Sequence, residues 1–141
     1  MRGLMKFHDV SVLSEFSQHW KFIFYLCYTE ENLEEVTKVI DDNIHFITQK
    51  VDDMDVLDYV MNFGKLDIAR VLIGKGASYE PGRLFDDALT CDLQIGSLAL
   101  IKYLVEELHL IPKAKDVDLA KALGKLDVVD FLDANLFHQE H

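Results

Sequence analysis

One sequence pattern recurs four times along the chain and constrains its fold more than any other feature. In each copy, aliphatic residues return at the three- and four-residue spacing of one helix face. The starts of successive copies, Glu31, Gly64, Gly96 and Gly124, lie 33, 32 and 28 residues apart. A period in this range indicates a stacked array of repeats. The four copies are ENLEEVTKVIDDNIH at 31–45, GKLDIARVLIGKGAS at 64–78, GSLALIKYLVEEL at 96–108 and GKLDVVDFLDANL at 124–136.

A second, shorter apolar run precedes each copy, so each repeat is predicted to be a pair of helices. The glycine that opens three of the copies then falls between the two helices, where a tight turn favours a residue with positive φ. Glu31 takes that place in the first copy. The preceding runs are FIFYLCY at 22–28, VLDYVMNF at 56–63, LFDDALTCDL at 84–93 and VDLAKAL at 117–123.

Residues at the helix ends fit the same plan. Gly76 is predicted to end its helix in the left-handed conformation, and Asn43, the next best residue for it, falls at the same place in the first copy. Short carboxylates are predicted to cap the starts of first helices. Pro81 and Pro112 are predicted to lie in the connections between repeats, because proline cannot continue a helix. The capping carboxylates are Asp52, Asp53, Asp55 and Asp116.

These patterns predict an all-α chain, with at most short hairpins. The 141 residues, half of them apolar, are enough for one domain with its own core. We therefore expect a single domain over 1–141, with a leader or N-terminal cap at 1–19. The repeats are expected at 20–45, 54–78, 84–110 and 116–137.

The charge of the chain restricts its partners. A net charge of −11 disfavours nucleic acid and anionic membranes, which need a basic footprint. A protein with a basic or mixed-charge surface fits better. The cysteines Cys27 and Cys91 are far apart and form no CxxC pattern, and no signal peptide or membrane span is evident. We expect a cytoplasmic protein and make no prediction of its oligomeric state.

Little in the sequence indicates catalysis. Neighbouring carboxylates point in different directions on a helix and are expected to be solvated. A nucleophile would require Cys27 or Cys91 beside His45 or His109, whereas cysteines among apolar residues are usually buried and inert. The tail histidines His138 and His141 have a spacing that can place two imidazoles on one helix face, but a terminal pair is a weak metal signal. We expect no enzyme, cofactor or metal site.

The second-helix pattern resembles that of the ankyrin-repeat family. GKLDIARVLIGKGAS carries the resemblance, which ENLEEVTKVI, GSLALIKYLV and GKLDVVDFL support, and it covers residues from about 20 to 137. The family's usual Thr-Pro-Leu-His start would fall on residues 55–58, where only Leu57 matches. The fourth repeat is also short after Leu108. These departures leave open whether the loops form the family's projecting hairpins. Tetratricopeptide repeats fit less well, because the period is short and their Trp, Leu-Gly and Tyr landmarks are absent.

The resemblance implies a fold and a role. It implies a solenoid of about four degenerate repeats, similar to those of large DNA viruses, intracellular bacteria and protists, which would act in the host cytoplasm if the source is viral or bacterial. It also implies a non-catalytic module that binds a partner protein through its concave face and inter-repeat loops. Two alternatives are a self-associating structural adaptor and a small thiol hydrolase. The implied contact residues are Thr29, Glu30, Asp52, Asp53, Asn62, Phe63, Tyr79, Glu80, Arg83, Gln94 and Ile95.

Overall fold

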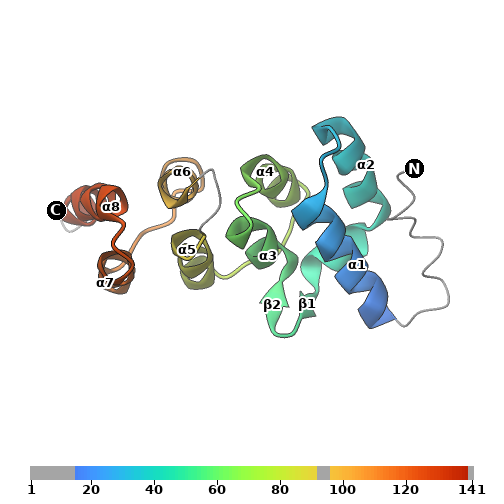
Figure 1. Ribbon diagram of the computed structural model, residues 1–141, viewed down its shortest axis with the longest axis horizontal. Helices are drawn as coiled ribbons and strands as arrows, with labels where there is room; N and C mark the ends of the chain where they lie inside the picture. The colour runs from blue at the N-terminus through green and yellow to red at the C-terminus, as the bar shows by residue number, and fades with distance from the viewer. Residues whose placement is uncertain (1–14, 92–95, 140–141) are drawn as a thin grey trace. The chain divides into compact units, whose positions relative to one another are not determined.

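A computed structural model describes residues 15–91 and 96–139 (Figure 1). The described chain is mostly helical, which confirms the all-α prediction. None of its helices is long and apolar enough to cross a membrane. In chain order the elements are α1 (Glu15–Tyr28), α2 (Leu33–Asp42), the 3-10 helix η3 (Ile44–Thr48), β1 (Lys50–Val51), β2 (Met54–Asp55), α3 (Val56–Asn62), α4 (Leu66–Gly74), α5 (Pro81–Leu89), α6 (Ser97–Lys102), the π-helix η4 (Tyr103–Glu107), α7 (Ala114–Ala122) and α8 (Leu126–Gln139).

Backbone contacts divide the chain into two compact units. The first unit comprises residues 1–60 and 65–78, and the second comprises residues 61–64 and 79–141. The first contains the helices of the first two predicted repeats except for the last residues of α3. The second contains those of the last two.

The predicted helices are present, with differences at their ends. Three first helices begin earlier than the apolar runs suggest, at Glu15, Pro81 and Ala114. Pro81 is thus the first residue of α5 rather than part of a connection. Proline is well suited to this position because the missing N–H would have no partner within the helix. Cys91 lies beyond the end of α5, not on it.

The turn glycines adopt the predicted conformation. Gly64, Gly96 and Gly124 have φ values of 72°, 81° and 73°. Gly76, with φ 95°, closes α4 as predicted. Its N–H donates to the carbonyl of Ile73, and the N–H of Ala77 donates to that of Leu72, both at 3.0 Å. These two bonds form a Schellman motif.

The first copy departs from this scheme at both ends. Asn43 has φ −123°, so the left-handed end predicted there is wrong. Because the chain runs on into η3, no reversal is needed, and the Asn43 side chain donates to the carbonyl of Val39 at 2.9 Å. At the other end, Asn32 caps α2 by accepting a hydrogen bond from the N–H of Glu35 at 2.9 Å.

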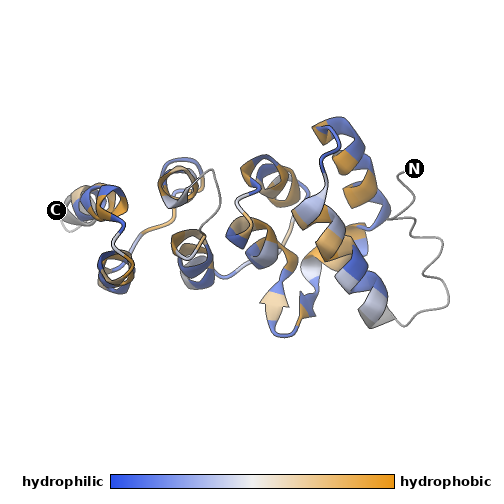
Figure 2. Cartoon of the chain, viewed as in Figure 1, coloured by the Kyte–Doolittle hydropathy of each residue, from blue (hydrophilic) through white to orange (hydrophobic). Residues whose placement is uncertain are grey.

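In the first unit, α2 packs against α4 and α1 contacts β1. In α2 and α4 the polar and apolar residues lie on different sides (Figure 2). The ring of Phe22 lies 6.0 Å from that of Phe46, which brings α1 against η3. Fully buried members of this core include Phe22, Ile23, Leu26, Ile40, Phe46, Ile47, Leu57 and Leu72.

In the second unit, the helices pack as stacked pairs. α5 pairs with α6 and α7 with α8, while α5 also contacts α7 and α6 contacts α8. The first leucine of two copies is an exception to the buried stripe. Leu126 is 70% exposed, and Leu33 in the first unit is also exposed. Fully buried members of this core include Leu84, Phe85, Ala88, Leu89, Leu100, Ile101, Leu104, Ala120 and Leu132.

A two-stranded antiparallel hairpin connects the first two repeats (Figure 1). Val51 pairs with Met54, which leaves Asp52 and Asp53 as a two-residue loop with φ values of 52° and 70°. Positive φ at both positions is typical of a type I′ turn, and aspartate tolerates this conformation better than most residues. Among residues 15–91 and 96–139 it is the only hairpin, and the connection from α6 to α7 has none.

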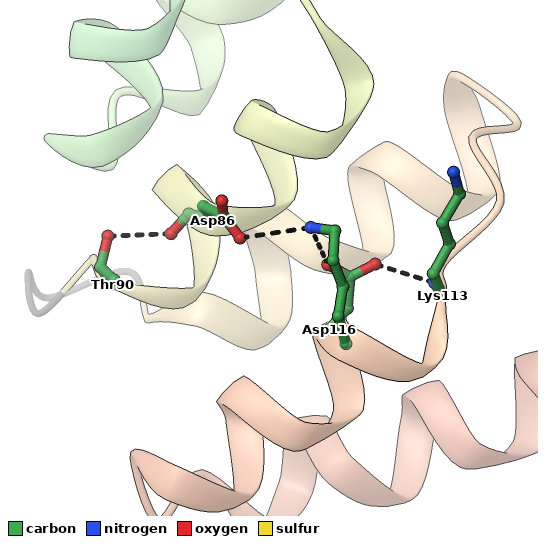
Figure 3. Close-up of polar contacts among 5 residues, drawn as sticks. Asp86, Thr90, Lys113 and Asp116 are labelled. Atoms are coloured by element: carbon green, nitrogen blue, oxygen red, sulfur yellow. Dashed lines mark hydrogen bonds and ion pairs between the residues drawn. The ribbon is translucent and has the colours of Figure 1, made fainter.

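Carboxylates cap two first helices, but not all those predicted to do so. Asp116 accepts a hydrogen bond from the N–H of Lys113 at 2.8 Å, as Figure 3 shows. At α3, it is Asp58 that accepts from the N–H of Asp55, at 2.9 Å. The Asp55 carboxylate instead accepts from the hydroxyl of Ser78 at 2.9 Å. Each capping carboxylate reaches back three residues to an amide at the helix start.

Candidate partner-binding surface

The first unit presents four of the predicted contact residues at two places. Asp52 and Asp53 are exposed at the tip of the hairpin. Thr29 and Glu30 follow α1, where the N–H of Thr29 donates to the carbonyl of Tyr25 at 2.9 Å. Glu30 is exposed and Thr29 is half-buried.

The second unit holds the remaining predicted residues that are described. The side-chain amide of Asn62 donates to the carbonyl of Asp87 at 3.1 Å and to the hydroxyl of Thr90 at 2.9 Å, so it is already engaged within the unit. Phe63, Tyr79 and Arg83 are half-buried, and Glu80, the residue before α5, is exposed. Gln94 and Ile95 lie outside the described residues.

A set of aromatic side chains on α1 was missed by the sequence analysis. Trp20, Phe24 and Tyr28 follow one another at four-residue intervals, with ring centroids 5.8 Å and 6.2 Å apart. Phe24 is 51% exposed and Tyr28 is 64% exposed. Residues four apart are neighbours on one helix face, so these rings form a continuous row.

Tyr59 of α3 extends this row toward the hairpin. Its ring meets that of Trp20 edge-on, with centroids 5.3 Å apart. Its hydroxyl donates to the carbonyl of Val51 at 3.0 Å. Trp20, Phe24, Tyr28 and Tyr59 are together called the aromatic ladder below. The ladder thus joins the outer side of α1 to the strand that carries the acidic hairpin tip.

The spacing of the rings was the available signal for the ladder. The run FIFYLCY at 22–28 was interpreted only as the apolar run of a first helix, but α1 contains two apolar faces. Phe22, Ile23 and Leu26 are buried, whereas the exposed rings lie on another side of the helix. A helix that packs against one core needs only one apolar face, so the second apolar face of α1 is not required for that packing.

Tyr25 illustrates the electrostatics at the end of α1. Its hydroxyl donates to the carboxylate of Glu31. Burial, and after it the hydrogen bond to Glu31, together raise the pKa of Tyr25 to about 12. Glu30 and Glu31 therefore place two carboxylates beside the C-terminal end of α1, where the helix dipole is also negative.

The cysteines do not form an activated nucleophile. Cys27 is 3% exposed, and burial raises the pKa of its thiol to about 12, although the charge of Lys65 acts weakly in the opposite direction. Cys91 is also buried. No hydrogen bond joins either thiol to His45 or His109 within residues 15–91 and 96–139. The His45 ring instead lies 4.1 Å from that of Phe46.

Two lysines in register in the repeats bind main-chain carbonyls of the preceding repeat. Lys125 Nζ donates to the carbonyls of Leu89 at 2.6 Å and Cys91 at 2.9 Å, and to the hydroxyl of Ser97 at 2.6 Å. Lys65 Nζ donates to the carbonyl of Thr29 at 3.4 Å. Each ammonium lies at the C-terminal end of a first helix, where a cation is favourable.

The Ser97–Lys125 pair has the residue types of a serine nucleophile and its base, but its geometry is structural. Ser97 is buried at the start of α6. Its hydroxyl lies 3.2 Å from the carbonyls of both Leu89 and Cys91, the same oxygens that accept from the ammonium. The Lys125 ammonium donates to three oxygens in this arrangement, and an ammonium that donates in this way offers no lone pair to accept a proton.

Metal ligands do not gather in the described part of the chain. No group of three or more His, Cys, Asp or Glu side chains there could hold an ion. The side chains of His138 and His141, considered in the sequence, fall outside what the structure describes.

Comparisons of the chain with known protein families, with curated proteins and with solved structures found no match.

Proposed function

We propose that the chain is a non-catalytic protein-binding module, built as a solenoid of four degenerate ankyrin-like repeats. Four helix pairs at the repeat spacing, with positive-φ glycines between the helices of three pairs, support this proposal. The hairpin between the first two repeats is the loop form that the ankyrin resemblance implies. The partner would meet the first helices and the inter-repeat loops.

The observation that carries the proposal is the exposure of the aromatic ladder. Phe24 and Tyr28, which follow Trp20 in the row, present large apolar surfaces to solvent. Exposed aromatic rings cost solubility and are enriched where proteins bind one another. In the first unit the ladder also lies on a first helix beside an inter-repeat hairpin, which are the two elements named by the proposal.

The charge of the chain suggests which partners fit. With a net charge of −11, it would attract proteins with a basic or mixed-charge surface and repel nucleic acid. Protein binding without chemistry needs no activated nucleophile, which agrees with the buried Cys27 thiol and the engaged Lys125 ammonium. A cytoplasmic location is part of the proposal.

Self-association through the same rings is the second candidate. An exposed row of aromatic residues can pair with a second copy as well as with another protein. A molar mass that rises with protein concentration, measured by sedimentation, would favour this alternative. A constant monomer mass would exclude it.

Affinity capture from cell lysate at physiological salt tests the proposed function. The wild type is compared with Phe24→Ala/Tyr28→Ala, and with the control Ile111→Ala/Leu126→Ala, which removes exposed apolar side chains from the second unit. All three proteins must first give the same helical spectrum. The proposal predicts a protein retained by the wild type and the control but lost by the ladder variant. Equal retention by all three would place binding elsewhere.

A further inference from the structure

We propose that the aromatic ladder binds a short, extended peptide segment of a partner that carries lysine or arginine among apolar residues. This inference rests on the proposed function and adds the chemical nature of the bound segment. It follows from the dimensions of the ladder, from the faces of its rings and from the charges at its two ends.

The length of the ladder sets the size of the segment. Trp20 and Tyr28 are eight residues apart on α1, which corresponds to about 12 Å at about 1.5 Å per residue. An extended peptide advances about 3.3 Å per residue. The row of three rings therefore accommodates about four residues of an extended segment, which is a linear motif rather than a folded domain face.

Acidic groups flank the ladder at both ends. Asp52 and Asp53 lie at the tip of the hairpin, whose strand β1 contacts α1 and accepts the Tyr59 hydroxyl at Val51. At the other end, Glu30 is exposed two residues after Tyr28. The negative end of the α1 dipole adds to this field.

Basic residues also lie on or beside the elements that carry the ladder and its acids. Lys65 Nζ lies 3.4 Å from the carbonyl of Thr29, and Lys50 Nζ lies 3.5 Å from the buried Asp55 carboxylate. Lys21 lies on α1 beside Trp20 and is half-buried. Asp52 at one end of the ladder and Glu30 at the other are exposed. A cation on the bound segment would therefore find a carboxylate at either end of the ladder.

Aromatic faces favour the same occupant. An ammonium or guanidinium over a tryptophan or tyrosine ring is attracted by the negative face of the ring. The apolar stem of lysine or arginine also packs along such rings while the charged head stays in water. An acidic segment would be repelled by the carboxylates at both ends of the ladder. A purely apolar segment would form no ion pair with them.

Three fluorescent peptides of equal length and without aromatic residues test the inference. They carry Leu-Arg, Leu-Gln or Leu-Glu repeats, and their binding to the full chain is measured by anisotropy at two salt concentrations. We expect the Leu-Arg peptide to bind about tenfold tighter than the Leu-Gln peptide, and more weakly at the higher salt concentration. Phe24→Ala/Tyr28→Ala should remove this binding.

Two charge variants distinguish binding at the ladder from the general attraction of a cationic peptide to an acidic chain. Asp52→Asn/Asp53→Asn removes the flanking charge, and asparagine keeps the positive φ accessible. The control Asp118→Asn/Asp133→Asn removes the same charge from exposed positions in the second unit. We expect weaker binding of the Leu-Arg peptide only in the hairpin variant.

Several results would overturn the inference. These are equal binding of the Leu-Arg and Leu-Gln peptides, equal loss in the two charge variants, or no binding of any peptide. If a captured partner is still lost on mutation of Phe24 and Tyr28, the binding function stands and only the cationic segment is wrong. Dimerisation blocked by the ladder mutations would make a second copy the occupant and would also overturn it.

Discussion

The first helices of the two units differ in the surface that they expose, although the same repeat pattern describes both. In the first unit, α1 exposes the rings of Phe24 and Tyr28. In the second unit, α5 and α7 expose charged groups, among them Asp86 and Lys115, whose charged atoms lie 3.7 Å apart with both side chains about half-exposed. The buried stripe that defines the repeat is thus independent of the outer surface. Binding chemistry can therefore differ between repeats that fold alike.

The two units also differ in the contacts of the lysine that follows a turn glycine. Lys65 and Lys125 follow turn glycines in register, yet Lys125 donates to three oxygens at 2.6–2.9 Å and Lys65 makes one contact at 3.4 Å with the Thr29 carbonyl. We expect the second unit to depend on its turn lysine more than the first unit does.

The largest expected effect comes from the buried leucines in register on α4 and α8. Leu72→Ala and Leu132→Ala each remove a fully buried side chain and should lower the free energy of unfolding by about 2–5 kcal/mol. Pulsed thiol labelling in denaturant, read by mass spectrometry, follows each unit through its own cysteine. Leu72→Ala should expose Cys27 of the first unit at lower denaturant, and Leu132→Ala should expose Cys91 of the second. Simultaneous labelling of both cysteines in both variants would contradict this prediction.

The second-largest effect is expected at alkaline pH, which should destabilise the first unit. The pKa values of Tyr25 and Cys27 are raised to about 12 from 10.0 and 9.0. The folded state therefore favours the neutral forms, and this stabilisation is complete below pH 9 and lost as the pH rises to 12. Thermal melts followed by the fluorescence of Trp20, the only tryptophan, report on this unit. Tyr25→Phe should make the melting temperature less sensitive to pH between 10 and 12. An unchanged pH dependence would contradict the assignment.

Replacing the turn lysines should have a moderate and unequal effect. Lys125→Met should cost about 1.5–3 kcal/mol, because charge-assisted hydrogen bonds to two carbonyls and a hydroxyl are lost in a part-buried site. Lys65→Met should cost less than about 1 kcal/mol. Equilibrium denaturation of the two variants measures both values. Equal losses would show that the difference in contacts has no energetic consequence.

The smallest effect is expected for the ion pair of α5 and α7. Lys115→Ala should change the free energy of unfolding by at most about 1 kcal/mol, because exposed ion pairs contribute little. The change should decrease further in high salt. A large, salt-independent loss would mean that Lys115 acts mainly through its contact with the buried Asp116, at 3.3 Å.

The sequence was most informative where backbone geometry allows few residues. The positive φ of Gly64, Gly96, Gly124 and Gly76 followed from glycine's lack of a side chain, and the helices followed from the aliphatic spacing. The prediction for Asn43 failed because an asparagine side chain can instead donate a hydrogen bond to a helix carbonyl.

The candidate surface was less predictable. The resemblance implied contacts by the loop residues Asp52 and Asp53 but left the hairpin itself open. The ladder was not predicted, because the sequence of a short helix does not show which of its apolar rings are buried and which are exposed. Phe22 and Phe24 are two residues apart, and only their packing shows that one is in the core and the other faces solvent. The contacts assigned to Gln94 and Ile95 stay predictions.

The position of Trp20 allows the most direct test of the ladder as the binding surface. Its ring lies between those of Phe24 and Tyr59, and it is the only tryptophan of the chain. Its emission should therefore respond when a ligand without aromatic residues covers the ladder. Titration with the Leu-Arg peptide should shift or quench the emission saturably, with the same Kd as anisotropy gives. Binding that leaves the emission of Trp20 unchanged would place the partner elsewhere and contradict the account.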